Sequence, residues 1–138
     1  GDHRDLHLSL RRQRQMCIRD RVTSDATLYL TGAIDWTHKV CARRSGEADM
    51  SKIQARIAEA TQDVIISVAE LLSFVSFAGA MAQLWSGQLV LYAGDNINVT
   101  SWLKKGGAGN LLARALLRIL RFLQATHHFQ ILPVYLRM

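Results

Sequence analysis

The first part of the chain carries short runs of β-branched and aromatic residues that predict strands. Residues 22–24 lead into Asp25, and residues 28–36 and 39–43 form two further candidate strands. Gly32 stands inside the first of these two runs. We therefore expect a bulge or a close backbone approach at that glycine.

A long apolar segment in the middle of the chain predicts the main helix. The stretch before it, residues 45–63, is polar and has room for a short surface helix at 51–60. Between residues 67 and 85, apolar side chains recur at spacings of three and four, as on the buried face of a helix. They are Val68, Leu71, Leu72, Val75, Ala78, Ala82 and Trp85. Ser67 followed by Glu70 fits a capping box, which predicts that this helix begins at Ser67.

The second half of the chain continues the alternation of helices and strands. We expect a turn at 86–87, a buried strand at 88–93, a short helix at 99–103, a loop at 104–109, a helix capped by Asn110 and ending near Thr126, and a last strand at 129–135. The core face of the longer helix is expected to carry Leu112, Leu116, Ile119, Leu120 and Leu123. This order predicts an α/β fold, with a mixed sheet flanked by helices.

The first 21 residues differ in origin from the rest. Residues 1–7 read back into the codons of a widely used flow-cell sequencing adapter, and residues 11–21 into a read-one primer joined to a transposon end. Both blocks stand in order and in one frame, with an index-sized gap between them. We interpret residues 1–21 as translated adapter, against the alternative of a basic arm or a transit peptide, and leave them out of the fold. One domain, residues 22–138, remains.

This interpretation changes the charge and the cysteine chemistry. The full chain has 17 basic and 11 acidic residues, and removing six arginines and three aspartates lowers the net charge from +6 to +3. Overall basicity is then weak evidence for a nucleic-acid partner. Cys41 is the one cysteine left, which excludes an internal disulfide and a cysteine-based zinc site.

Three acidic residues stand where solubility does not require them. Asp25 follows the first strand, Glu70 lies in an apolar helix, and Asp95 follows a buried strand. Carboxylates on neighbouring elements can hold hard divalent cations, and two such ions can clamp the attacking and leaving oxygens of a phosphodiester. Each acid also has a structural alternative. Asp25 would be a turn residue, Glu70 only the capping-box partner, and Asp95 a turn or helix-start acid.

The chain resembles the ribonuclease H-like domain of retroelement reverse transcriptases in several short segments taken in order. Residues 22–27 (VTSDAT) with 32–33 (GA) are similar to its opening strands, and residues 66–72 (ISVAELL) are similar to its first helix, which carries a glutamate. Residues 89–96 (LVLYAGDN), with Val99, Trp102 and Leu103, are similar to the strand that bears its next aspartate. Residues 109–120 and 129–137 are similar to its following helix and its last strand.

The resemblance implies a function and a set of site residues. Asp25, Glu70 and Asp95 would be catalytic acids that bind two Mg²⁺ or Mn²⁺ ions, with carboxylates within roughly 4–8 Å of one another. The substrate would be the RNA strand of an RNA–DNA hybrid, and an upstream reverse transcriptase domain would belong to the intact polyprotein. The family has a fourth acidic or histidine ligand on a helix after the last strand. We expect this fragment to be incomplete at both ends and to lack that helix. We therefore expect its nuclease activity to be feeble.

Basic and polar residues suggest where a nucleic acid would bind. Arg114, Arg118 and Arg121 form a stripe on one helix face, preceded by Lys104 and Lys105. This stripe could follow a phosphate backbone or be a solvated face. The nucleic-acid-binding residues predicted from these features and the resemblance are Asn96, Lys104, Lys105, Arg114 and Arg118. The glycine-rich segment 106–109 could hold a phosphate or be a plain turn.

Other readings of the sequence compete with a nuclease. A degenerate domain of the same fold would bind nucleic acid or serve as a structural module without catalysis. A small membrane-associated helical protein is a third reading, because residues 64–85 could span a bilayer. Glu70 would cost about 2.5–3.5 kcal/mol at a membrane centre, so we favour a buried helix and expect no membrane partner. The pair His127-His128 suggests zinc only weakly, and the three tryptophans are typical of core or rim positions.

Overall fold

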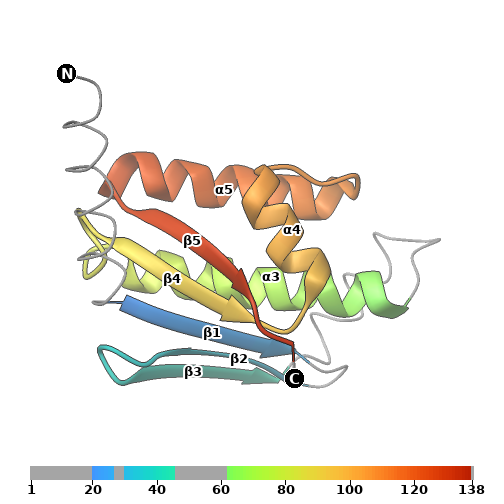
Figure 1. Ribbon diagram of the computed structural model, residues 1–138, viewed down its shortest axis with the longest axis horizontal. Helices are drawn as coiled ribbons and strands as arrows, with labels where there is room; N and C mark the ends of the chain where they lie inside the picture. Colours follow the sequence, from blue (N-terminus) through green and yellow to red (C-terminus); the bar gives the residue numbers. More distant parts are fainter. Residues whose placement is uncertain (1–19, 27–29, 46–61, 138) are drawn as a thin grey trace.

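The computed structural model describes residues 20–26, 30–45 and 62–137. Figure 1 shows the elements within these ranges. The strands are β1 (Asp20–Ala26), β2 (Leu30–Asp35), β3 (Val40–Ser45), β4 (Leu89–Gly94) and β5 (Gln130–Tyr135). The helices are α3 (Gln62–Met81), α4 (Ile97–Lys105) and α5 (Leu111–His127).

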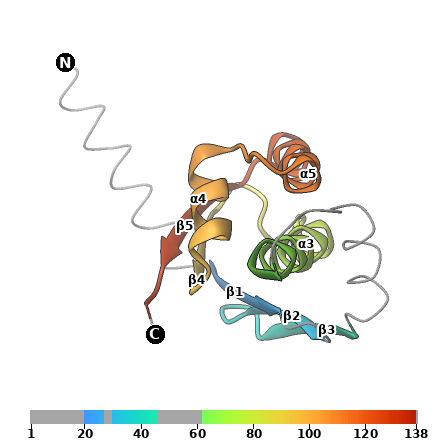
Figure 2. The same cartoon turned by 90° about the vertical axis from the view of Figure 1, so that its right-hand side faces the viewer.

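The strands form one mixed sheet with the order β3-β2-β1-β4-β5. Strands β1, β2 and β3 pair antiparallel as consecutive hairpins, whereas β1 pairs parallel with β4, and β4 pairs parallel with β5. Seen along the sheet in Figure 2, the three helices lie on one side of it. The expected mixed α/β architecture is therefore confirmed, with these helices covering one face of the sheet.

Strand β1 includes two residues that the sequence analysis assigned to the adapter. Asp20 pairs with Val90 and Arg21 with Leu91, so both extend the parallel ladder with β4. Backbone hydrogen bonding is independent of side-chain identity, so residues translated from an adapter would also be able to complete a strand. The predicted packing of residues 1–19 and the surface helix at 51–60 lie outside the described residues.

The structure has no bulge at Gly32, which was one of the two alternatives expected there. Gly32 pairs with Asp25 on one side and with Arg43 on the other, in an uninterrupted register. Glycine can occupy a regular strand because its small side chain removes packing contacts but leaves both backbone hydrogen-bonding groups in place. A bulge would have changed the register of the ladder in which Asp25 lies.

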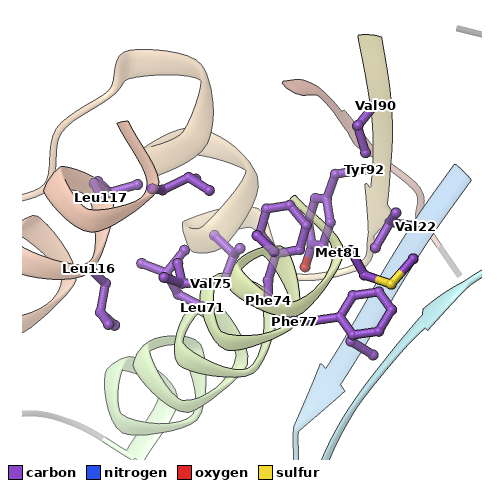
Figure 3. Packing of buried hydrophobic residues seen from close by; sticks show 14 of the residues in the cluster. Val22, Leu71, Phe74, Val75, Phe77, Met81, Val90, Tyr92, Leu116 and Leu117 are labelled. Atoms are coloured by element: carbon purple, nitrogen blue, oxygen red, sulfur yellow. The ribbon is translucent and has the colours of Figure 1, made fainter. Parts of the chain in front are cut away.

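The core is built around α3, which packs against β1, β2 and α5. Figure 3 shows Phe74 from this helix beside Tyr92 of β4, and their ring centroids lie 4.4 Å apart. Trp85 continues the aromatic cluster, with its ring 6.3 Å from Phe74 and 5.5 Å from Phe129. Aromatic side chains bury large apolar areas, so this cluster stabilises the packing of α3 against β4.

Helix α3 begins earlier than the sequence suggested, which overturns the capping box. It starts at Gln62, so Ser67 lies inside the helix and is buried. The reason is tertiary packing: Ile65 is buried in the core, and Val64 and Ile66 pack against it. Burial of these β-branched residues outweighs their modest cost in a helix.

The same helix is the one candidate membrane span within the described ranges. The segment Val64–Met81 is long and apolar enough to cross a membrane, but 61% of it is buried inside the fold. Helices at the centre of a core are apolar on most sides, as α3 is here.

Helix α5 follows its predicted caps closely. The side chain of Asn110 accepts hydrogen bonds from Leu112 N and Ala113 N, as an N-cap should. The helix buries Ala113, Leu116, Leu117 and Leu120. Ile119, which was expected in the core, is 51% exposed, because the buried face is centred on Leu116, Leu117 and Leu120 and Ile119 falls outside it.

Candidate functional site

The parallel pairing of β1 and β4 brings two of the predicted acids to one edge of the sheet. Thr23 pairs with Ala93. Asp25 follows Thr23 by two residues, and Asp95 follows Ala93 by two residues. Parallel strands that share a register end at the same edge. Asp25 and Asp95 are therefore at corresponding positions at the carboxyl edge of the sheet. Asp95 is exposed there.

The third acid, Glu70, lies on α3 at the level of this edge. Ser67 precedes it by three residues, and its Oγ lies 3.0 Å from Nδ2 of Asn96. Asn96 follows the last residue of β4 by two positions. Four residues after Glu70, Phe74 packs on Tyr92 inside β4. Residues at these helical spacings share one face, so Glu70 lies between the two contacts, level with the last residues of β4. Its side chain is only 2% exposed.

The structural alternatives are excluded for Asp25 and Glu70 but not for Asp95. Asp25 lies within β1, paired with Gly32, and not in a turn. Glu70 is the ninth residue of α3 and cannot cap its N-terminus. Asp95 precedes the residue that caps α4, which is Asn96. Asp25 and Glu70 therefore stand where a turn or a helix cap does not require them, whereas Asp95 lies in the bend between β4 and α4, as a turn or helix-start acid would.

The distances among the three carboxylates remain a prediction, since the side chain of Asp25 is outside the described part of the structure. Within that part, no group of three histidine, cysteine, aspartate or glutamate side chains lies close enough to hold a metal ion. His127 and His128 are also not part of such a group within the described residues. His128 caps the carboxyl end of α5 in a left-handed conformation.

Asn96, predicted to contact nucleic acid, has a structural role in the link between β4 and α4. Its Oδ1 accepts hydrogen bonds from Asn98 N at 2.9 Å and Val99 N at 3.2 Å. Asn98 Nδ2 also donates to Ser67 Oγ, at 3.1 Å. Three polar side chains thus fix the start of α4, and the position of Asp95 immediately before it, against α3.

The predicted basic residues surround the loop between α4 and α5. Lys104 and Lys105 are exposed in the last turn of α4. Arg114 Nε donates to Ala108 O at 3.1 Å, and Arg121 Nη2 donates to Gly106 O at 2.8 Å. These two arginines hold the glycine-rich loop in place. Arg118 is exposed on the same helix.

Sequence reasoning missed a buried carboxylate at the other end of the sheet. Asp35 is fully buried, and its Oδ2 accepts a hydrogen bond from Trp85 Nε1 at 2.9 Å and lies 2.7 Å from His38 Nδ1. Its Oδ1 accepts from Thr37 N and His38 N. Burial acts to raise the pKa of Asp35, but the hydrogen bonds from Trp85 and His38 outweigh it and hold the pKa below its usual value.

This cluster ties the β2–β3 hairpin to the segment after α3, and we assign it a structural role. An aspartate two and three residues before the amides of Thr37 and His38 is a turn signal that the sequence does carry. The partner Trp85 lies 50 residues away, and no local pattern indicates that contact.

The tryptophans are distributed as core and rim residues. Trp85 is fully buried and Trp102 packs against the core, whereas Trp36 is 58% exposed. Trp36 Nε1 donates to Thr23 Oγ1 at 3.0 Å, which links β1 to the hairpin.

Comparison of the chain with protein-family models, with curated proteins and with solved structures found no match.

Proposed function

We propose that this chain is a ribonuclease H-like domain that cleaves the RNA strand of RNA–DNA hybrids with two divalent metal ions. In the intact protein this domain would follow the polymerase domain of a retroelement reverse transcriptase. The observation that carries the proposal is the register of β1 and β4, which brings Asp25 and Asp95 to corresponding positions at the carboxyl edge of the sheet.

The chemistry of the three acids fits hard divalent cations. Mg²⁺ and Mn²⁺ prefer oxygen ligands, and aspartate and glutamate supply them. Glu70 adds a carboxylate that is nine-tenths or more buried and level with the same edge. When bound, a metal pair would activate water and stabilise the leaving oxygen.

The order of elements supports the family resemblance. The resemblance implies opening strands with an aspartate, a helix with a glutamate, a strand ending at a second aspartate, a further helix and a last strand. Strand β1 carries Asp25, α3 carries Glu70, β4 ends next to Asp95, and α5 and β5 follow. Helix α4 lies between β4 and α5, where the resemblance includes Val99, Trp102 and Leu103.

Basic side chains near the loop after α4 are suited to the charge of a nucleic acid. Lys104, Lys105 and Arg118 are exposed, and each can neutralise a phosphate. Phosphate contacts position a duplex but do not distinguish RNA from DNA. That distinction would come from contacts with 2′-hydroxyl groups and from duplex shape.

Cleavage of a labelled hybrid by the full chain tests the proposal. The RNA strand of an RNA–DNA hybrid is labelled at one end and incubated with excess protein and MgCl₂ or MnCl₂. We expect slow, metal-dependent cleavage of the RNA strand, and no cleavage of the DNA strand or of a DNA duplex. Asp25→Asn, Glu70→Gln and Asp95→Asn, purified identically, should each abolish it. Lys39→Gln, an exposed cation in the turn between β2 and β3, is the matched surface control and should retain cleavage. Equal cleavage by Asp95→Asn would contradict the mechanism.

A second candidate function is a degenerate domain of this fold that binds nucleic acid without catalysis. It is favoured by the exposed cations near the loop, which need no acidic residue to hold phosphates. Hybrid binding by every variant, with no cleavage by any, would support this binding module. Absence of both binding and cleavage would contradict both functions.

A further inference from the structure

A cavity of about 310 Å³ opens between α4 and the end of β5. Figure 1 shows that α4 lies beside the last part of β5. The cavity is lined by Ile97, Thr100, Ser101, Lys104, Lys105 and Tyr135. Its volume is at the lower end of the range for small-molecule sites, about 300–1,000 Å³, and suits a ligand of one ring system and one small polar group.

The walls of this cavity are apolar. Ile97 and Tyr135 remain 65% and 40% exposed, although both are large hydrophobic residues. Thr100, at 3% exposure, is the most buried of the lining residues. Its hydroxyl donates to Asn96 O at 2.8 Å, so its methyl group is left to face neighbouring side chains. An aromatic ring and an aliphatic side chain on opposite elements are suited to hold a flat ring between them.

Two cations stand at the end of the cavity. Lys104 and Lys105 follow Ile97 by seven and eight residues, which places them two turns further along α4 on its cavity side. Neither lysine forms an ion pair with any residue that the structure describes. The cavity therefore combines apolar walls with uncompensated positive charge, and an anionic group attached to a flat ring complements both.

The cavity also adjoins the edge that carries the acids. Ile97 follows Asp95 by two residues. Tyr135 pairs with Gly94, and Leu136 N donates to Gly94 O at 2.8 Å. A ligand in the cavity would thus lie next to the carboxyl end of β4.

We propose that this cavity binds a single nucleotide, with the base against Tyr135 and Ile97 and the phosphate at Lys104 and Lys105. The inference deepens the proposed function, on which its biological meaning rests: the nucleotide would belong to the bound nucleic acid, beside the edge that carries the acids. Base stacking on an aromatic side chain contributes to binding whatever the base, because every base has a π-face. The cavity would therefore position a strand without reading its sequence.

Binding in the absence of divalent metal separates this inference from catalysis. The full chain is titrated in EDTA with adenosine 5′-monophosphate, inorganic phosphate, adenosine and a fluorescently labelled oligoadenylate, with chemical shifts or anisotropy as the readout. We expect the nucleotide to bind more tightly than phosphate or adenosine alone. Tighter binding of the oligonucleotide than of the mononucleotide identifies a strand as the source of the ligand; the reverse result identifies a free nucleotide and overturns the strand-positioning role.

Four variants assign the parts of the cavity. Tyr135→Leu keeps apolar bulk but removes the ring, and should weaken nucleotide binding at least about fivefold while leaving phosphate binding unchanged. The double variant Lys104→Gln/Lys105→Gln should weaken both and reduce the salt dependence. The matched controls are Phe122→Leu, an exposed aromatic on α5, and Lys39→Gln, an exposed cation in the turn between β2 and β3.

Unchanged nucleotide binding by Tyr135→Leu would overturn the inference, as would equal losses in the two control variants. Asp95→Asn should still bind the nucleotide in EDTA even though it has lost cleavage. If cleavage fails in the wild-type chain but nucleotide binding follows the variants as expected, only the proposed function fails. If cleavage succeeds and the cavity variants bind normally, only this inference fails.

Discussion

Ser67 in the middle of α3 and Asn96 at the start of α4 lie in side-chain contact, with Ser67 Oγ 3.0 Å from Asn96 Nδ2. The two residues are 29 positions apart in the sequence. Asn96 also caps α4, so one amide links the core helix to the carboxyl end of β4. This contact holds the segment with Asp95 at the level of Glu70.

Asn96→Ala should lower the free energy of unfolding by about 1–2 kcal/mol, because it removes both the α4 cap and the contact with Ser67. Asn96→Asp keeps an acceptor for the helix amides and should cost less. Urea denaturation measures both. The matched control is Asn110→Ala on α5, which removes a cap of two equivalent amides and should cost about 1 kcal/mol; the Asn110 side chain forms no hydrogen bond with α3 among the described residues. A smaller loss in Asn96→Ala than in Asn110→Ala would contradict the linking role.

The buried carboxylate of Asp35 should make stability depend on pH in the acid range. Its pKa in the folded protein lies below its ordinary value. A group with a lowered folded pKa stabilises the protein above its unfolded pKa, and this contribution is lost as the pH falls through the folded pKa. Asp35→Asn should therefore cost about 2–3 kcal/mol at pH 7, and the difference from wild type should shrink below about pH 4.

Trp85→Phe provides the second variant for this cluster. It removes the indole donor to Asp35 and keeps most of the aromatic packing, so the expected loss at pH 7 is about 1–2 kcal/mol. Chemical denaturation at several pH values measures both variants. A loss in Asp35→Asn that is the same at pH 3 and pH 7 would show that its hydrogen bonds do not depend on its charge.

The elements of the second half were predictable because their signals are local. Asn110 provides an N-cap at the start of α5, and the short apolar run before Asp95 is a buried strand. The start of α3 was not predictable in this way. Ser67 resembles an N-cap in the sequence, but its hydroxyl bonds to Asn96, and the burial of Ile65 carries the helix back to Gln62.

The site shows the same division between local and distant information. The positions of the three acids on successive elements could be read along the chain. That Asp25 and Asp95 lie near the same ends of adjacent strands follows from the parallel pairing of β1 with β4, two strands between which the described residues place β2, β3 and α3 in the sequence. Strand neighbours of this kind are set by long-range packing, for which the sequence has no local signal.

Gly106 should be sensitive to substitution in a way that its neighbour is not. It ends α4 in the left-handed region at φ 68°, and its amide donates to Trp102 O at 2.8 Å. A methyl group there would also approach Arg121 Nη2 to 3.1 Å. Gly106→Ala should lower the free energy of unfolding by about 1–2 kcal/mol.

Gly107→Ala is the matched control for this substitution. A Cβ at Gly107 would meet nothing within 4 Å, and its φ is not in the left-handed region, so we expect stability equal to wild type or slightly higher. Gly106→Asn should fall between the two alanine variants, since asparagine tolerates the left-handed region. Thermal and urea denaturation distinguish the three. Equal losses at Gly106 and Gly107 would mean that the loop as a whole, and not the left-handed cap, responds to substitution.

The acids should bind divalent metal even where cleavage is slow, and thermal denaturation can detect it. A ligand that binds only the folded state raises the free energy of unfolding, by about 2.7 kcal/mol when its concentration is a hundredfold above Kd. Clustered carboxylates repel one another and a cation relieves that repulsion, so Mn²⁺ should raise the Tm of the full chain and EDTA should reverse the rise. Asp25→Asn, Glu70→Gln and Asp95→Asn should each remove most of the increase.

Asp35→Asn is the matched control: it removes a buried carboxylate outside the proposed site, and should lower the Tm in EDTA while retaining the full increase with Mn²⁺. If all four variants respond to Mn²⁺ like the wild type, the metal acts through general charge screening and the three acids do not form a site.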